Sequence, residues 1–450
     1  MTIMVRLEGN TVYQQTGDLQ LAVANSDAHV ATLAKAENRI EANLHTSIDV
    51  ENTYNLLFNG FSFTGEAWMI DAINEMAGVT AFEAPVFELI DAEVSDPSSL
   101  TPSMSTSTGM TRASAAWDLG YTGKGTVIAV IDTGIRATHE AFSVMPENGK
   151  IDMDYLKQVY ADYGQYLHAG TAANLDDIYE NEKLPFNWDY FDGDAIPNHT
   201  ASDHGTHVAG IAAGNNGSNF KGVAPDAQIV TMQVFTDAGG AGFDTLMCAM
   251  EDCVYLGVDA INMSLGSAAG YTAYESVIAE LEDIYAALEN AGVSVAAASG
   301  NDGFSTVWTN YGDWFYSQYR WPAANPDVGL IGSPATFVGS FGVASVQNSS
   351  VEGGGYLNAY GRDYYPATIS DVPSLGELEG GEYDIVFAGL GSPEEITAAG
   401  GVEGKIALVQ RGTLTFSEKC ENAAAAGAAA VIIFNNAAGA FNPSVSSSIP

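Results

Sequence analysis

From Thr126 onward, short apolar runs alternate with longer segments of helical periodicity, and this alternation constrains the fold more than any other feature of the chain. The short runs TVIAVID, AQIVTMQVF and VSVAAAS are almost continuously apolar, as strands buried on both faces are. The longer segments DTLMCAMEDCVYLGV and YESVIAELEDIYAALENAG carry apolar residues at helical spacing. The pattern predicts an α/β domain built on a doubly wound parallel sheet.

Ligands of such sheets bind at the carboxyl ends of the strands. Asp132, the stretch from Ser264 to Gly266, and Asn301 all fall where a predicted strand ends. We therefore expect the functional site at this edge of the sheet.

Two histidines, His204 and His207, lie three residues apart at the start of a predicted helix, within DHGTHVAGIAAG. This spacing places them on one helix face, so they fit either a metal pair or a general base. A closed metal site needs three or four ligands, and no further His or Cys converges with them in the sequence. A general base needs a carboxylate on its second ring nitrogen, and Asp132 is suited to that task. A single Asp at a strand end is more often a turn residue, so this pattern leaves the alternatives open.

Two further stretches have both a functional and an ordinary interpretation. The amide of Asn301 could donate to an oxyanion, or Asn301 could be a turn residue before Asp302 and Gly303. The stretch NMSLG could pair with an extended peptide, or it could be a simple strand-to-loop turn.

Four segments in this order, VIDTG, HGTHVAG, INMSLG and AAASGNDG, closely resemble the subtilisin-like serine proteases. The resemblance extends from about Trp117 to Val346. It implies that Asp132 is the orienting acid, His204 the general base and Asn301 the oxyanion donor. It also implies a substrate cleft whose walls include Ser264, Leu265, Gly266, Ser299 and Gly300.

The resemblance gives the other histidines no part in the chemistry. His207 becomes a structural residue of its helix, and His139 matches a position of the family that is not catalytic. A zinc hydrolase built on the histidine pair is then a distant alternative.

The flanking regions suggest four parts. Residues 1–95 have the pattern of a small α+β domain and resemble the inhibitory propeptide of this family, whose NGFS element stands at Asn59 to Ser62 and whose tail lies in the substrate cleft. Residues 96–112, rich in Ser, Thr and Pro, predict an exposed, cleavable linker. Residues 113–350 are the N-terminal part of the catalytic domain. Residues 351–450 resemble an incomplete protease-associated α/β domain, inserted as in the cell-envelope proteinases called lactocepins.

The family's nucleophilic serine lies in a GTSMA-type motif, and that motif does not occur in the 450 residues. We therefore expect the chain to be the N-terminal portion of a serine endopeptidase that acts on polypeptides, with its Ser beyond Pro450. The alternative is a catalytically inactive, subtilisin-like module that binds proteins. The first residues lack the features of a signal peptide, so the expected secreted or wall-associated location follows from the resemblance alone.

Composition excludes several classes of partner. The chain has 15 Lys and Arg against 56 Asp and Glu, and the net charge of −41 argues against nucleic acid and anionic lipid. No apolar run approaches the ~18 residues of a membrane span. The three cysteines lack the spacing of a disulfide framework. The chemistry needs no cofactor, and the acidic balance suits a structural calcium ion, although no loop identifies its site.

Overall fold

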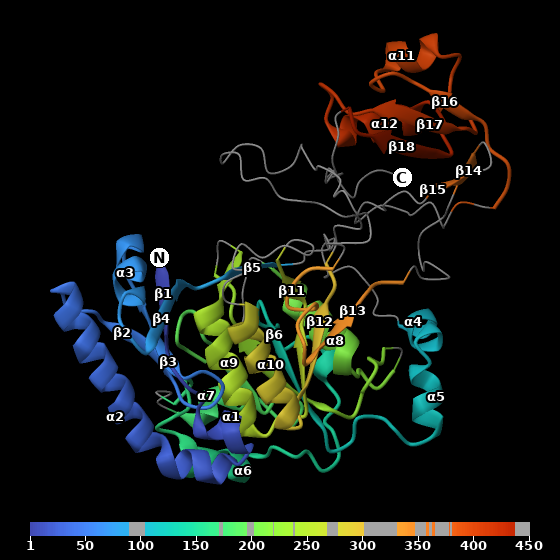
Figure 1. Ribbon diagram of the computed structural model, residues 1–450. Coiled ribbons are helices and arrows are strands. Elements are labelled where there is room, and N and C mark those ends of the chain that lie inside the picture. The colour runs from blue at the N-terminus through green and yellow to red at the C-terminus, as the bar shows by residue number, and fades with distance from the viewer. Residues whose placement is uncertain are drawn as a thin grey trace. The chain divides into compact units, whose positions relative to one another are not determined.

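The computed structural model describes residues 1–89, 104–170, 174–195, 202–218, 220–236, 239–267, 278–300, 331–346, 357–359, 362–364, 378 and 380–436 (Figure 1). The chain forms two compact units. The first contains Met1–Ala92 and Ser107–Gln347, and the second contains Glu93–Thr106 and Asn348–Pro450.

The first unit begins with an α+β layer. Its antiparallel sheet has the order β2-β3-β1-β4, with strands β1 (Thr2–Leu7), β2 (Val50–Tyr54), β3 (Gly60–Thr64) and β4 (Val79–Glu83). The accompanying helices are α1 (Val12–Thr16), α2 (Leu19–Leu44) and α3 (Ala67–Asn74). Leu33, Ile40 and Leu44 of α2 recur at helical spacing and are buried in one cluster with the sheet residues Val5 and Phe63.

A six-stranded sheet forms the centre of this unit, and all of its pairings are parallel. This confirms the predicted parallel sheet. In the order β13-β12-β10-β6-β8-β7, its strands are Ser340–Val343, Ser294–Ala298, Ala260–Met263, Val127–Asp132, Gln228–Gln233 and Phe186–Asp189. The three long helices next to it are α8 (His204–Ala213), α9 (Phe243–Leu256) and α10 (Ile278–Asn290). Figure 1 shows α9 and α10 on one side of the sheet and α8 on the other.

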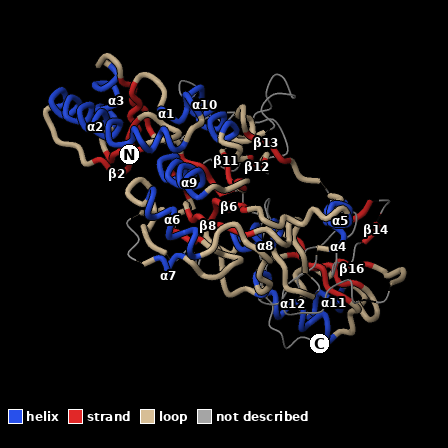
Figure 2. The backbone as a smooth tube through the Cα atoms, turned by 90° about the horizontal axis from the view of Figure 1, so that it is seen from below, coloured by secondary structure: helices blue, strands red, loops and turns tan. Residues whose placement is uncertain are grey.

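Helix α9 is buried on every side, and Thr245 is the one residue of the helix outside its buried set. A helix that is covered all round needs a second layer over its outer face. The N-terminal layer supplies it, because Tyr13 and Tyr54 share a core cluster with Met247 and Met250 of α9. Both views place α1 beside α9 (Figures 1 and 2).

The remaining elements of this unit are helix α6 (Met153–Tyr163) and several shorter ones. The shorter ones are β5 (Val86–Leu89), α4 (Ser105–Met110), α5 (Ala113–Asp118), η2 (Glu140–Phe142), α7 (Leu175–Ile178), β9 (Gly240–Gly242) and β11 (Leu265–Gly266). Helix α4 lies inside residues 96–112, where the sequence predicted only a linker. The helix is short and made of small and polar residues, and the Thr111 hydroxyl donates to the Ser107 carbonyl at 2.8 Å, so apolar periodicity could not reveal it. Residues 90–103 lie outside the described part of the chain.

The second unit contains a parallel sheet of β16 (Ile385–Phe387), β17 (Ile406–Gln410) and β18 (Ala430–Phe434), with helices α11 (Pro393–Ala398) and α12 (Phe416–Ala425). Strands β14 (Leu357–Ala359) and β15 (Arg362–Tyr364) form an antiparallel pair. Capping boxes at Ser392 and Thr415 start the two helices. The Ala-rich run from Ala423 passes from helix α12 to strand β18, and Gly427 supplies the positive φ of 77° at the turn.

Two sequence-based expectations concern features of the whole chain. All three cysteines are free thiols in the structure. Within the described ranges, no helix combines the length and the apolarity that a membrane crossing requires.

Candidate active site

The centre of the candidate site is a contact between Asp132 and His204. Asp132 is the last residue of β6 and is fully buried, and His204 is the first residue of α8 and is 7% exposed. Atom Nδ1 of His204 lies 2.8 Å from Oδ1 of Asp132. A carboxylate bonded to one ring nitrogen fixes the imidazole tautomer and leaves the other nitrogen to act as a base.

Backbone geometry brings the two residues this close. The amide of Thr133 donates to the same oxygen, Oδ1 of Asp132, at 2.7 Å, which orients the carboxylate. The amide of Gly205 donates to the hydroxyl of Thr133 at 3.0 Å, so the turn after β6 is tied to the start of α8. A Cβ at position 205 would lie 2.1 Å from the carbonyl oxygen of Gly134, so only glycine permits this approach.

A second set of contacts fastens the same turn to the same helix. The guanidinium of Arg136 lies 2.8 Å from Oδ1 of Asp203, and the amide of Arg136 donates to the hydroxyl of Thr206 at 2.8 Å. Asp203 occupies the N-cap position of α8 but makes no capping bond with its side chain, which it uses for the ion pair instead. The helix start is thus held by the turn rather than by its own cap.

The other two histidines from the sequence analysis lie outside this contact. His207 is exposed one turn further along α8. His139 caps the short helix η2, since its Nδ1 accepts from the amide of Ala141 at 3.2 Å. Among the described residues, no cluster of three or more His, Cys, Asp or Glu side chains is arranged to hold a metal ion.

An extended strand already lies beside the predicted cleft wall. Strand β5, from the N-terminal layer, pairs antiparallel with β11 through Leu265↔Leu89 and Gly266↔Glu88. Its other edge pairs with β9, through Phe87↔Ala241 among other partners. The stretch from Leu265 to Gly266 therefore pairs with an extended segment, as one interpretation of NMSLG expected.

The side chains of β5 alternate in their environment. Phe87 is 2% exposed, and its ring lies 6.1 Å from that of Phe243, whereas Val86 is 57% exposed. This alternation is what a strand lying in a groove shows, with one side chain inserted and the next pointing out. Ser264, just before β11, accepts through its hydroxyl from the side-chain amide of Asn262 at 3.0 Å.

The remaining predicted residues follow β12. The backbone of Ser299 donates to Val343 and accepts from Gly332, so Ser299 extends the sheet pairing. Gly300 has a φ of 95°, a conformation that favours glycine. Asn301 lies outside the described residues.

Sequence reasoning missed two features next to this site. Strand β9 (Gly240–Gly242) pairs with the other edge of β5, and Glu251 of α9 accepts from the backbone of the N-terminal layer. The small residues around β9 gave no periodic signal. The adjacent carboxylates Glu251 and Asp252 in the middle of a mostly apolar helix were a sign in the sequence, because buried carboxylates need partners.

Fold and site together define an α/β protein with a buried carboxylate–histidine pair, an arrangement that can fix the imidazole tautomer. The chain belongs to the subtilase family, which it matches over residues 123–444.

Similar proteins carry protease names. The chain is 30% identical over 447 residues to a PII-type proteinase of Lactococcus lactis subsp. cremoris. This alignment covers 95% of the chain and 22% of that protein. It is 28% identical over 412 residues to the minor extracellular protease Vpr of Bacillus subtilis, covering 88% of the chain and 42% of that protein. It is 32% identical over 332 residues to a C5a peptidase of Streptococcus pyogenes, and this alignment covers 70% of the chain and 26% of that protein. The chain thus spans less than half the length of each of these relatives.

Proposed function

We propose that the chain is the N-terminal portion of a serine-type endopeptidase that hydrolyses polypeptides through an Asp–His–Ser triad. Asp132 holds Nδ1 of His204, so that Nε2 takes the proton of the serine hydroxyl as its oxygen attacks the peptide carbonyl. Asn301 stabilises the oxyanion, and water then hydrolyses the acyl-enzyme. The observation that supports this most is the 2.8 Å contact between His204 and the buried Asp132.

The nucleophile is proposed to lie in a GTSMA-type segment outside these 450 residues. Ser202 is the described serine nearest to the base in the sequence, and its hydroxyl accepts from the backbone amide of His204 at 3.2 Å. That contact engages the Ser202 hydroxyl within its own turn, two residues before His204. The alternative is an inactive module that binds proteins in the same cleft and has Asp132 and His204 but no nucleophile.

Labelling with a serine-directed phosphonate tests this assignment. The 450-residue chain should not be labelled, whereas the full-length gene product should be labelled at a GTSMA-type serine, because only an activated serine reacts. The substitution His204→Ala should abolish labelling by removing the base. As the matched control, His207→Ala, one turn further on the same helix, should leave labelling intact.

Two results would contradict the proposal. Labelling of the 450-residue chain at one of its own serines, lost on His204→Ala, would place the nucleophile inside the chain. A folded full-length product that is never labelled would favour the inactive binding module.

The N-terminal segment, residues 1–95, is proposed to be an inhibitory propeptide. Strand β5 occupies the position between β9 and β11 in which a peptide substrate would pair by strand addition. We expect it to leave after cleavage between Glu93 and Thr111, which mass spectrometry of the mature full-length enzyme would locate. A mature N-terminus before residue 80 would contradict this assignment.

The other features of the proposal concern location and accessory parts. Residues 351–450 are proposed to be a protease-associated module, consistent with the parallel α/β sheet β16–β18. A secreted or wall-associated location is supported by the relative named a minor extracellular protease. The chemistry uses no cofactor; a structural calcium ion is a separate proposal, which titration calorimetry with Ca²⁺ tests.

A further inference from the structure

Cys248 of α9 is a buried nucleophile that the proposed mechanism does not use. Its thiol is free, and the residue is 3% exposed. Cys248, Glu251 and Asp252 stand at positions i, i+3 and i+4 of the helix, so their side chains share one face. Both carboxylates are fully buried. The thiol is therefore one member of a polar cluster rather than part of a purely apolar core.

The N-terminal segment bonds to this face of α9 on both sides of Cys248. One turn before the thiol, the Tyr54 hydroxyl lies 3.2 Å from the carbonyl oxygen of Asp244. About one turn after it, each carboxylate oxygen of Glu251 lies 3.1 Å from the amide of Asn55. Burial raises the pKa of Tyr54 most, and the nearby Cys248 raises it further. Because the segment runs from one contact directly to the next, it covers the thiol.

A histidine of the catalytic portion, residues 113–350, completes the surroundings of the thiol. Nε2 of His168 lies 3.1 Å from Oε2 of Glu251, and its ring packs against Tyr54 with centroids 5.7 Å apart. Burial raises the pKa of the Cys248 thiol, whereas the adjacent His168 lowers it. A histidine next to a cysteine favours the thiolate, which is the form that attacks electrophiles. The thiol thus has a partner that favours its reaction, and burial opposes that reaction.

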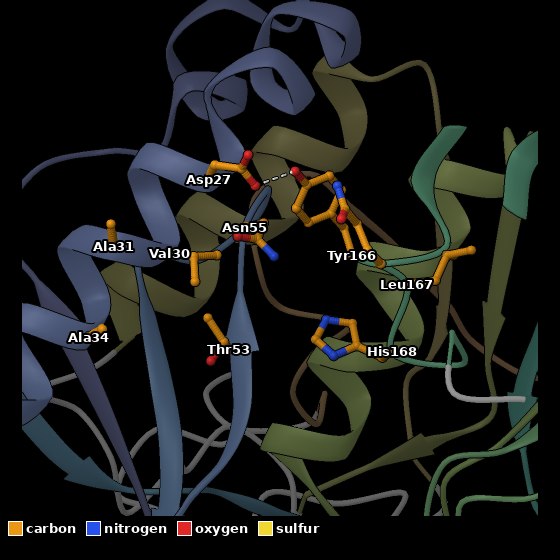
Figure 3. Close-up of a pocket in the computed structure, with 10 residues that line it drawn as sticks. Asp27, Val30, Ala31, Ala34, Thr53, Asn55, Tyr166, Leu167 and His168 are labelled. Carbon is orange, nitrogen blue, oxygen red and sulfur yellow. Dashed lines mark hydrogen bonds between the residues drawn. The ribbon is translucent and has the colours of Figure 1, made fainter. Parts of the chain in front are cut away.

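An open pocket leads from solvent to the edge of this cluster (Figure 3). The pocket has a volume of about 660 Å³, and its lining includes His168 together with Thr53 and Asn55 at the end of β2. Figure 3 shows the His168 ring next to these two residues of the segment. Cys248 is not one of the described lining residues. A small molecule in the pocket therefore reaches the thiol only when the end of β2 moves away from α9.

We propose that Cys248 is a covalent modification site masked by the N-terminal segment, which small cationic disulfides reach once the end of β2 leaves α9. The Cys248 thiol gives its proton to water, and the thiolate attacks one sulfur of the disulfide. A new S–S bond forms, and the other sulfur leaves as a thiolate that takes up a proton from water. The adduct then occupies the place of Tyr54, so that the segment cannot return.

The inhibitory role of the segment is itself part of the proposed function. Masking of the thiol needs only the contacts of Tyr54 and Asn55 with α9, which are present whether or not the segment inhibits an enzyme.

The charges around the thiol determine which disulfides react. Besides burial, which raises the pKa of Cys248 most, Asp252 and Asp244 each raise it, so both carboxylates act on the sulfur. The whole chain carries a net charge of −41. A field of this sign concentrates cations and repels anions. A cationic disulfide should therefore react faster than an anionic one.

Alkylation of the 450-residue chain with N-ethylmaleimide, mapped by peptide mass spectrometry, tests the mask. The chain contains its own controls. Cys420 is half-buried in the second unit and should react, whereas Cys253 is fully buried with its Sγ 3.4 Å from Sδ of Met232 and should not. Cys248 should react much more slowly than Cys420 while the segment is in place.

The substitution Tyr54→Ala removes the side chain that lies over the thiol. It should raise the alkylation rate of Cys248 by at least about tenfold, because loss of a buried ring also weakens the docking of the segment. Cys253 should stay unreactive, which excludes global unfolding as the cause. The matched control is Tyr285→Ala, which removes another fully buried tyrosine, on α10, and should leave Cys248 slow. A Cys248 that reacts as fast as Cys420 in the wild type, or that stays slow in folded Tyr54→Ala, would overturn the mask.

If Tyr54→Ala does not fold, the wild-type chain in increasing, sub-denaturing urea decides. Cys248 should become reactive together with the loss of hydrogen-exchange protection at the amides of residues 55–57, and at a lower urea concentration than Cys253. Local opening precedes global unfolding where contacts are few. Reaction of Cys248 only together with Cys253 would overturn the mask.

Two disulfides of opposite charge test the class of reagent under the same conditions. Cystamine, a dication, should modify Cys248 at least about tenfold faster than the dianion dithiodiglycolate. After modification and return to buffer, the amides of residues 55–57 should exchange at least about tenfold faster than before, because the adduct overfills the place of Tyr54. The variant Cys248→Ser, treated in the same way, should show no change.

Equal rates for the two disulfides, or unchanged exchange in the modified wild-type chain, would contradict the proposal. No readout uses peptidase activity, so failure of the masked site and failure of the proposed function are distinguishable.

Discussion

In the full-length gene product, Asp132→Asn should lower turnover by roughly 10⁴ at neutral pH while the fold is retained. The carboxylate is fully buried and lies 2.8 Å from Nδ1 of His204, so it determines which ring nitrogen carries the proton. An amide in its place favours the wrong tautomer and gives no charge to stabilise the imidazolium. Steady-state kinetics on a peptide substrate, with circular dichroism to verify folding, measures the effect.

The matched control is Asp154→Asn, which changes an exposed carboxylate on α6 paired with Lys157 at 3.2 Å. Exposed ion pairs contribute little, so turnover and stability should stay close to those of the wild type. A loss below tenfold for Asp132→Asn, together with loss of activity on adding a chelator, would instead support the metal hydrolase.

The sheet could be predicted because strands such as β6, β7 and β8 are buried on both faces. All six residues of β8 are buried, and the apolar run that encodes them has no polar alternation. The helical spacing of its apolar residues likewise predicted helix α9. The pairing of Asp132 with His204 was implied by the resemblance of VIDTG and HGTHVAG to the subtilisin-like motifs, because their positions at a strand end and a helix start left other interpretations open.

The pairing of β5 with β9 and β11 could not be found in the same way. It joins Val86–Leu89 to partners about 150 or more positions further along the chain, and local periodicity carries no information on such pairings. The contact of Glu251 with Asn55 is of the same kind. Only the adjacent carboxylates Glu251 and Asp252 within a mostly apolar helix indicated that such partners exist.

In the same full-length product, Gly205→Ala should lower turnover by about 10² or more, although residue 205 takes no part in the chemistry. The new Cβ would lie 2.1 Å from the carbonyl oxygen of Gly134 and 3.2 Å from Oδ1 of Asp132. Backbone atoms cannot yield as a flexible side chain can, so the start of α8 must move away from the turn. A displacement of about 1 Å between catalytic groups can cost 10²-fold in rate.

Gly210→Ala on the same helix separates this steric effect from a general effect of alanine. A Cβ at position 210 would meet only the ring of Phe220, at 3.6 Å, which is an ordinary contact. Alanine inside a helix is favoured over glycine by about 0.5–1 kcal/mol, so this variant should keep its activity and gain stability. Gly205→Ala should instead melt at a lower temperature, because overpacking at a rigid site typically costs about 1–3 kcal/mol. If Gly205→Ala shows the kinetics and the melting temperature of the wild type, the start of α8 can accommodate a Cβ next to the Asp132 turn without disturbing the 2.8 Å contact. The steric argument for glycine at position 205 would then be wrong.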